Sequence, residues 1–524
     1  MHTMSTPSIT ARRGAVTSAF PAASDAGVEM LRAGGNAIDA AVAAAWALCV
    51  CEPSGSGLGG QTIALVQPAR GPAVVVDGHS RAPAAVSRAT VTRAQQQRGH
   101  RACTVPTTPA TLEHMHRRWG RLPTAHVLEP AIRLAEEGYA ITRLQRRQLR
   151  WCRVALAATP AAARFLGPGG RPPQLGATFA QPELAAALRR IADAGATDVY
   201  DGEIARAIVD DMRRSGGLLD AADLAGCGAP AERAPLAVAH AGFEVLTAPP
   251  PGGGRELALA LRLLERLEVP ADAPGHEWLA ALAGVTRLTF AERERRPVRP
   301  AEWSAELEER LLGDGRVERL AAAAAAGLPA GGGASAEGAG ETTHLCAADD
   351  EGGVVSLTQS IQSLFGAKVA NPRYGFLYNN YLLTCPRRPH RYRLRGGGPV
   401  RSNAAPTLVR TPDGAPRLAL GAAGSRRIIS AVLHVIAGVV HREADLAAAL
   451  AQPRIHARLG GAAWLERDGA TAELRALLER RGIPVVLKPP HSFCMGAVQA
   501  IAFGAGGAMV AAADPRREGE PRGL

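Results

Sequence analysis

Hydrophobic and polar residues alternate along two neighbouring segments, 342–349 and 354–361, in the pattern of half-buried β-strands. The tetrapeptide Asp-Glu-Gly-Gly between them is typical of a hairpin turn. A third strand, near 415–420, runs into the glycine-containing turn 421–425, and an apolar helix is expected from about 427 to 440. The carboxyl part of the chain is therefore predicted to be rich in β-structure.

The amino part combines buried helices with strands. Residues 24–33 predict a short helix closed by two glycines. Asn36 is expected to cap a second helix, 37–50, which is apolar nearly all round and should be buried. Strands are predicted at 62–66 and 73–77.

The middle of the chain, residues 105–310, is predicted to be mostly helical, with amphipathic stretches at 124–137 and 181–192 and a Pro/Gly loop at 249–254. Together with the flanking segments this gives an alternating α/β pattern. A Gly/Ala-rich run follows at 326–341, and its composition predicts a mobile, exposed segment.

The pair Thr342-Thr343 stands where that run ends and the strand pattern begins. A chain cut before Thr342 would carry a hydroxyl and a free α-amine on one residue. Because such an amine has a pKa of roughly 7.7–8.0, it can act as general base for the hydroxyl. The alternative from composition alone is an interdomain linker followed by an ordinary edge strand.

The length and charge of the chain limit the kinds of protein that it can be. With 524 residues and 47% apolar content, the chain can bury a large core in two or more packed units. The net charge of +12 would suit nucleic acid or acidic substrates. However, only two lysines occur, which points to an arginine-biased proteome, and no basic motif with interleaved aromatics appears. We expect no nucleic-acid partner.

Neither a membrane, a metal nor a cofactor is expected. The N-terminus lacks a signal pattern, and the longest apolar run, Ala40–Val50, is too short to span a bilayer, so a cytoplasmic protein is predicted. The eight cysteines show no Cys-x-x-Cys spacing, and His114 and His116 point to different helix faces. The glycine loop 55–60 has dinucleotide-like spacing, but its helix–loop–strand order excludes that function.

Many short motifs in sequence order closely resemble the γ-glutamyltranspeptidase family of N-terminal-nucleophile hydrolases. The motifs are Ala33–Val42, Glu52-Pro53 with the glycine loop 55–60, Pro106–Gly138, Tyr200-Asp201-Gly202, Gly216–Leu219, Pro249–Gly254, Thr342-Thr343-His344, Val355–Ser360, Asn379-Asn380, Gly421–Ile429, Pro453–His456 and Asp514-Pro515-Arg516.

The resemblance implies a four-layer αββα sandwich, made as a precursor that cuts itself at Glu341–Thr342. The products would be a large subunit, 1–341, and a small subunit, 342–524, that stay associated. Thr342 would be the nucleophile that forms an acyl-enzyme with an amide substrate. Ser360 stands where the family has a second threonine, and Gly424 and Ser425 match the oxyanion-hole glycine pair. The Gly-to-Ser change is tolerable where the backbone does not need a positive φ.

The donor pocket departs from the family pattern. His79 stands in place of the arginine that holds a glutamyl carboxylate, with Arg81 two residues on, and Ser402-Asn403 replaces a Ser-Ser pair. The remaining pocket positions carry Gln362, Asn380, Tyr381 and Thr384, without the expected acidic group. Because a buried ammonium without a carboxylate partner costs several kcal/mol, recognition of a free glutamyl α-amine is not expected.

Residues 385–398 are shorter than the family's lid loop, which should open the site to water and favour hydrolysis. The five arginines of this segment either attract an anionic substrate or form a solvated loop. Three functions follow. The first is a self-processing amidohydrolase on a small-molecule or peptide amide that is not a standard γ-glutamyl compound. The others are a conventional glutathione hydrolase or γ-glutamyltransferase, and an uncut, non-catalytic binding protein.

Overall fold

The structure is a computed structural model, and it describes residues 6–325, 340–457 and 460–524. The segment predicted to be mobile, 326–341, lies outside the described residues except for Gly340 and Glu341.

Two seven-stranded sheets form the centre of the molecule, and all neighbouring strands in both are antiparallel. The first sheet has the order β19 (Pro521–Gly523), β2 (Gly14–Ser18), β10 (Gly340–Asp349), β11 (Val354–Ser363), β3 (Gln61–Gln67), β4 (Val74–Gly78) and β7 (Ala231–Arg233). The second has the order β1 (Ser8–Ala11), β18 (Met509–Ala513), β17 (Ala497–Phe503), β13 (Pro416–Ala423), β12 (Thr407–Arg410), β9 (Phe243–Thr247) and β8 (Leu236–His240).

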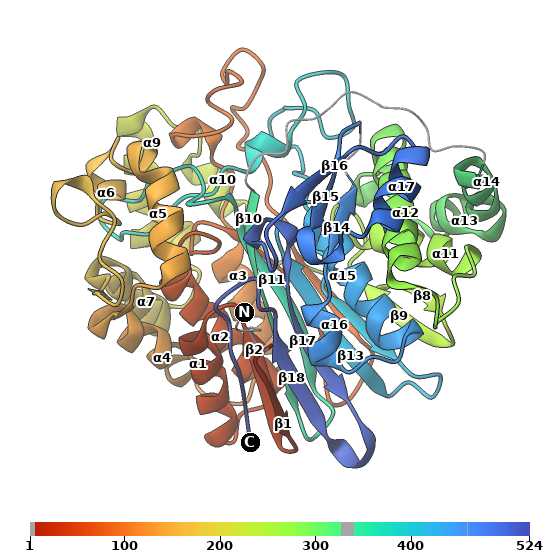
Figure 1. Ribbon diagram of the computed structural model, residues 1–524. Helices are drawn as coiled ribbons and strands as arrows, with labels where there is room; N and C mark the ends of the chain where they lie inside the picture. The colour runs from red at the N-terminus through yellow and green to blue at the C-terminus, as the bar shows by residue number, and fades with distance from the viewer. Residues whose placement is uncertain (1–5, 326–339, 458–459) are drawn as a thin grey trace.

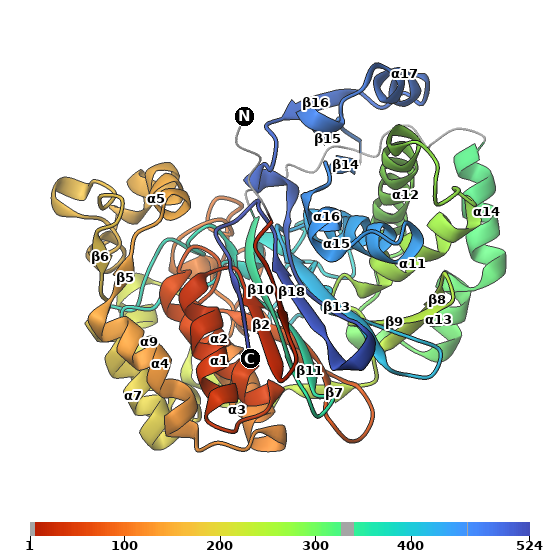
Figure 2. The same ribbon diagram turned by 60° about the horizontal axis from the view of Figure 1, so that its bottom comes forward.

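Helices cover the outer face of each sheet, as Figures 1 and 2 show. On the first sheet these are α1 (Pro21–Arg32), α2 (Ala37–Cys51), α3 (Thr108–Trp119) and α4 (Thr124–Glu137), with α5 (Arg143–Leu156), α6 (Pro160–Ala163), α7 (Pro182–Ala194), α8 (Asp198–Asp201), α9 (Glu203–Ser215) and α10 (Ala221–Ala225) further out. On the second they are α11 (Gly254–Arg266), α12 (Gly275–Arg295), α13 (Ala305–Leu312), α14 (Asp314–Ala325), α15 (Arg427–Ile436) and α16 (Leu446–Ala451). This is the four-layer αββα sandwich that the resemblance implied.

Two smaller sheets complete the fold. One is made of β14 (Ile455–Ala457), β15 (Ala463–Glu466) and β16 (Val485–Lys488), next to α17 (Ala472–Arg480). The other pairs β5 (Tyr139–Ala140) with β6 (Thr178–Phe179) beside α5.

Local sequence signals explain the central elements. The side chain of Asn36 accepts hydrogen bonds from the backbone N–H groups of Ile38 and Asp39, and the Asp39 carboxylate accepts from the Asn36 N–H. This capping box starts α2, every residue of which is buried, as its apolar sequence predicts. The predicted hairpin is also present, as β10 and β11.

The sequence prediction missed the strands at 231–247, inside the segment expected to be mostly helical. They form β7, β8 and β9, at the ends of the two sheets. Each has only three to five residues, and β7 is largely exposed, so the alternation of apolar residues is too short to stand out.

Strands from before and after Thr342 are interleaved. In the first sheet β10 lies between β2 and β11, and β11 pairs with β3 on its other side. In the second sheet β12 pairs with β9. Because backbone hydrogen bonds connect the two parts throughout both sheets, a cut at residue 341 would leave them in one fold.

Candidate active site

Thr342 lies at an irregularity near the open end of the β10–β11 hairpin, where β10 begins and β11 ends. Glu341 pairs with Gln362 and Thr343 with Gln359, and the register shifts between these pairs. Ser360 and Ile361 of β11 therefore lie opposite the single residue Thr342, which is the arrangement of a β-bulge, a feature that redirects side chains. Thr342 is 6% exposed, and its neighbour Glu341 is 1% exposed.

The Ser360 hydroxyl connects the Thr342 hydroxyl to the preceding peptide bond. Thr342 Oγ1 donates to Ser360 Oγ at 3.3 Å, and Ser360 Oγ donates to the Glu341 carbonyl oxygen at 2.8 Å. The Gln362 N–H donates to the same Ser360 oxygen at 2.9 Å. One hydroxyl therefore receives a hydrogen bond from the nucleophile and gives one to the carbonyl that the nucleophile would attack.

The turn after β13 presents two residues with left-handed backbones. Gly424 has a φ of 127° and Ser425 a φ of 58°, directly before the amino end of α15. The turn lies close to the β10 start, since a Cβ built on Gly340 would be 2.6 Å from Ser425 Oγ. Serine can replace the family's glycine at 425 without cost only if the backbone there does not need a positive φ. Position 425 does need one, and a positive φ costs a non-glycine residue roughly 1–2 kcal/mol.

Replacing Ser425 by glycine is expected to raise the free energy of unfolding by about 0.5–1 kcal/mol. Relief of the left-handed strain exceeds the extra entropy that glycine has in the unfolded chain. Chemical denaturation of Ser425→Gly and of Ser425→Ala measures the effect. A glycine variant no more stable than the alanine variant would contradict it.

Seven of the sequence-predicted residues surround one small cavity next to Thr342. The described residues that line it are Ile63, Thr342, Thr358, Ser360, Gln362, Tyr381, Ser402, Asn403, Ala404, Ser425 and Ile428. None of them carries a charge. The cavity thus offers hydroxyl and amide groups but neither a carboxylate nor a guanidinium on its wall.

The side chain of Glu341, the residue before Thr342, forms an ion pair with Arg517. The Arg517 guanidinium donates to the Glu341 carboxylate and, at 2.5 Å, to Glu52. All three side chains are at least 90% buried. Burial raises the pKa of Glu52 above its ordinary value, although Arg517 opposes the shift. Two carboxylates thus share one buried cation. No motif in the sequence indicates that Arg517 contacts Glu341.

A family model described as Gamma-glutamyltranspeptidase matches residues 23–524. The chain belongs to the γ-glutamyltranspeptidase family. It is 34% identical to the Acylase ACY 1 proenzyme of Pseudomonas sp. (strain V22) over 98% of this chain and 94% of that protein. It is 29% identical to the glutathione hydrolase proenzyme of Escherichia coli (strain K12), over 97% and 91% of the two chains. The solved cephalosporin acylase of Bacillus halodurans superimposes with a TM-score of 0.88 at 27% identity, over 99% of this chain and 97% of that one.

In this family member, the other predicted site residues lie outside the set that lines the cavity. His79 Nδ1 contacts Asp77 at 2.5 Å, and Asp77 also accepts from Arg233 at 2.9 Å. Burial disfavours the Asp77 carboxylate, but His79 and Arg233 outweigh it and lower its pKa to about 2. Arg81 donates to the Gly226 carbonyl.

Asn380 and Thr384 support the backbone around Tyr381. The Asn380 amide donates to the Gln97 carbonyl at 2.7 Å and accepts from the Ser363 N–H. The Thr384 hydroxyl donates to the Tyr381 carbonyl at 2.8 Å and accepts from the Arg401 N–H. Both side chains are engaged in hydrogen bonds within the fold.

Arg293 of α12 stands behind the Ser402-Asn403 pair of this γ-glutamyltranspeptidase-family chain. It donates to the Ser402 carbonyl at 2.7 Å and to Asn403 Oδ1, and it is 8% exposed. Burial lowers its pKa to about 10, against the effect of Glu256. Because Oδ1 already accepts from Arg293, the amide N–H groups of Asn403 remain available to the cavity.

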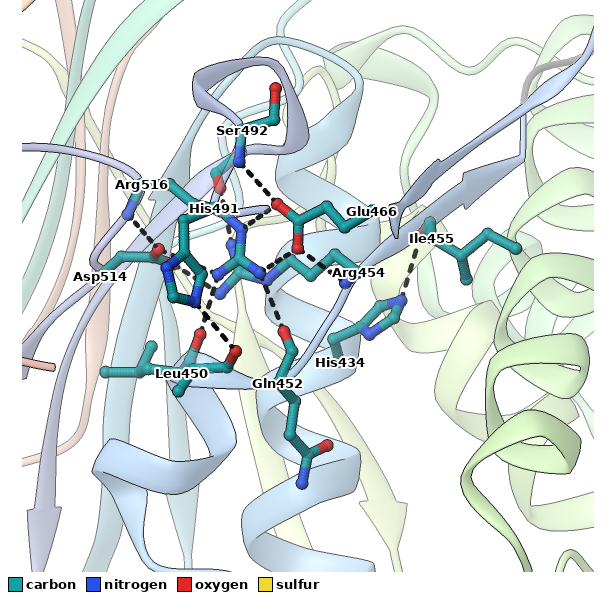
Figure 3. Close-up of polar contacts among 12 residues, drawn as sticks. His434, Leu450, Gln452, Arg454, Ile455, Glu466, His491, Ser492, Asp514 and Arg516 are labelled. Carbon is teal, nitrogen blue, oxygen red and sulfur yellow. Dashed lines mark hydrogen bonds and ion pairs between the residues drawn. The ribbon is translucent and has the colours of Figure 1, made fainter. Parts of the chain in front are cut away.

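Figure 3 shows a cluster of buried charged side chains, Arg454, Glu466, Asp514 and Arg516. Arg454 pairs with Asp514 at 2.5 Å, and Arg516 bridges Asp514 and Glu466. Arg454 also donates to the Gly496 carbonyl at 2.6 Å. A Cβ on Gly424 would lie 2.8 Å from the Cα of Gly496, so the cluster supports the back of the turn.

Replacing Asp514 by asparagine is expected to cost about 3–5 kcal/mol of stability at neutral pH, since it leaves two buried guanidinium groups short of a partner. Burial disfavours the carboxylate, but Arg454, Arg516 and two backbone N–H groups keep the pKa of Asp514 below its ordinary value. The folded pKa is therefore below the unfolded one, about 3.9, and the stabilisation is present above that pH and lost as pH falls through the folded value.

Denaturation midpoints from pH 7 to pH 2 test this prediction for as long as the protein stays folded. The gap between Asp514→Asn and the parent should narrow as pH falls below about 4. Asp413→Asn, in an exposed turn, serves as the control with the same change in charge. A gap that is small at pH 7 or independent of pH would contradict the role of the cluster.

Proposed function

We propose that this protein is a self-processing amidohydrolase that cleaves an amide through an acyl-enzyme on Thr342, with hydrolysis favoured over transfer. The observation that carries the proposal is the Thr342 hydroxyl, which lies opposite the β-bulge of β11, donates a hydrogen bond to Ser360 and faces the same cavity as the Ser425 turn. The precursor would be cut at Glu341–Thr342 into subunits 1–341 and 342–524. Relatives named proenzymes support a precursor.

Self-cleavage would follow the hydrogen bonds around Ser360. Thr342 Oγ1 attacks the Glu341 carbonyl carbon and passes its proton to Ser360, which gives its own proton to the carbonyl oxygen. The proton of the resulting hydroxyl then moves to the Thr342 nitrogen as the carbonyl re-forms and the C–N bond breaks, so the nitrogen leaves as an amine. Water hydrolyses the resulting ester, which frees the Glu341 carboxyl group and restores the Thr342 hydroxyl.

The mature site would repeat this chemistry on a substrate. The free α-amine of Thr342, with an ordinary pKa of roughly 7.7–8.0, takes the proton of the Thr342 hydroxyl as it attacks the substrate carbonyl. Backbone N–H groups of Gly424 and Ser425, at the positive end of α15, would stabilise the oxyanion. The amine product departs with the transferred proton, and water releases the acyl group.

The uncharged wall of the cavity favours a donor without a free α-ammonium group. Burying an ammonium beside hydroxyls and amides, with no carboxylate, costs several kcal/mol. Neutral donors such as the Asn403 amide suit a carbonyl or carboxylate oxygen instead. The higher identity to an acylase, 34%, than to the E. coli glutathione hydrolase, 29%, supports the same choice.

Two chromogenic substrates test the donor. γ-Glutamyl-p-nitroanilide and glutaryl-p-nitroanilide have the same five-carbon acyl chain, and only the first carries an ammonium group. We expect a higher kcat/KM for the glutaryl compound, by tenfold or more, since each factor of ten corresponds to about 1.4 kcal/mol. An equal or higher value for the γ-glutamyl compound would instead identify a conventional glutathione hydrolase. Failure to cut either substrate or itself would favour the non-catalytic alternative.

A further inference from the structure

The segment 138–182 stands out by its charge. It contains seven arginines and no Asp, Glu or Lys, so it accounts for +7 of the chain's net charge of +12. The arginines are Arg143, Arg146, Arg147, Arg150, Arg153, Arg164 and Arg171. Five of them belong to α5, which lies among the outer helices at the upper left of Figure 2.

The helix α5 has one buried and one outward face. Leu149 and Leu156 pack inward, each less than 5% exposed. Arg143, Arg147, Arg150 and Val154 are exposed and recur at the spacing of a single helical face. Val154 is 77% exposed, and Trp151 beside it is 55% exposed.

Most of this positive charge is not neutralised within the protein. Of the seven arginines, only Arg164 forms an ion pair among the described residues, with Glu183 at 3.2 Å. Arg147 stacks on Trp151 at 5.2 Å. By contrast, in the arginine-rich loop 385–398, Arg388 pairs with Glu294 at 3.2 Å and Arg391 pairs with Glu302. The positive charge of α5 is therefore more available to a partner than the charge of the loop 385–398.

We propose that the outward face of α5 docks on the surface of an anionic phospholipid bilayer. Three of the five exposed large apolar side chains in the described residues, Trp151, Val154 and Leu175, fall in this acid-free segment. Arginines around exposed Trp and aliphatic groups match the headgroup region of a charged bilayer, where each basic residue adds roughly fivefold to binding.

The same face suits nucleic acid and acidic proteins less well. The exposed aliphatic side chains Val154 and Leu175 offer neither hydrogen bonds to phosphates nor a surface on which bases stack, and Arg147 already stacks on Trp151. No described helix has the length and apolar content needed to cross a bilayer, so the contact would be peripheral. This surface departs from the sequence-based expectation of no membrane partner.

Sedimentation with vesicles tests the proposal on the full protein. The probes are vesicles of phosphatidylcholine alone and vesicles with about one-third phosphatidylserine, at low and physiological salt. We expect binding only to the anionic vesicles, weakened by salt. The variant Arg143→Gln/Arg147→Gln/Arg150→Gln should bind roughly a hundredfold less tightly, and Val154→Asp several-fold less.

A control variant removes the same charge elsewhere. Arg189, Arg266 and Arg373 are each more than half exposed and paired with a glutamate on the protein surface. Arg189→Gln/Arg266→Gln/Arg373→Gln should keep vesicle binding. Equal loss in both triple variants, or no binding by the parent, would overturn the proposal. Retention of duplex DNA by the parent but not by the α5 variant, without vesicle binding, would assign the surface to nucleic acid and overturn it too.

Discussion

The variant Thr342→Ala is expected to remain a single 524-residue chain with no amidase activity. Without Oγ1 there is no nucleophile for the Glu341 carbonyl or for a substrate, and the Ser360 hydroxyl keeps only the Gln362 N–H as a hydrogen-bond donor. Thr342→Ser retains a hydroxyl and should still be cut, but more slowly. Denaturing gels over time, with N-terminal sequencing of the smaller fragment, provide the measurement.

The parent should give two fragments, the smaller one beginning Thr-Thr-His-Leu-Cys. Cleavage of the alanine variant at the same bond would show that another group cuts the chain. A parent that stays intact under conditions where it is folded would show that the bulge opposite Thr342 is an ordinary strand irregularity.

Arg517→Met is expected to destabilise the uncut precursor by about 3–5 kcal/mol, because it leaves Glu52 and Glu341 buried without a cation. The measurement is best made in the Thr342→Ala background, where every molecule is uncut. In the Thr342-containing chain the same change should slow self-cleavage, since Arg517 fixes the residue that supplies the scissile carbonyl.

Arg522→Met is a matched control, since Arg522 pairs with Asp25 near the surface, where an ion pair contributes at most about 1 kcal/mol. Urea denaturation of both variants compares them directly. Equal stability of the two would mean that the Glu341–Arg517–Glu52 cluster contributes nothing special to the precursor.

Much of the fold could be predicted because its signals are local. The alternation on both sides of the 350–353 turn, the Asn36 cap and the apolar helix after it each depend on neighbouring residues. The position of Thr342 at the start of a strand followed from the same alternation. Family motifs then supplied the layer order, which local patterns do not contain.

The rest depends on contacts between residues far apart in the sequence. Arg517 lies 176 positions from Glu341, and Arg293 lies 110 from Asn403. No pattern of residue spacing in the sequence predicts contacts between such distant residues. Likewise, the left-handed backbone at Ser425 is set by the packing of the turn, and Arg233, which pairs with the Asp77 carboxylate beside His79, lies 156 positions from Asp77.

The most direct test of the central claim is the mass of the Thr342 peptide after mixing processed protein with glutaryl-p-nitroanilide and quenching in acid within one turnover. We predict an added glutaryl group on the peptide that begins at Thr342, absent after hydroxylamine treatment. An adduct on any other residue, or p-nitroaniline release with no adduct at any quench time, would contradict an acyl-enzyme on Thr342.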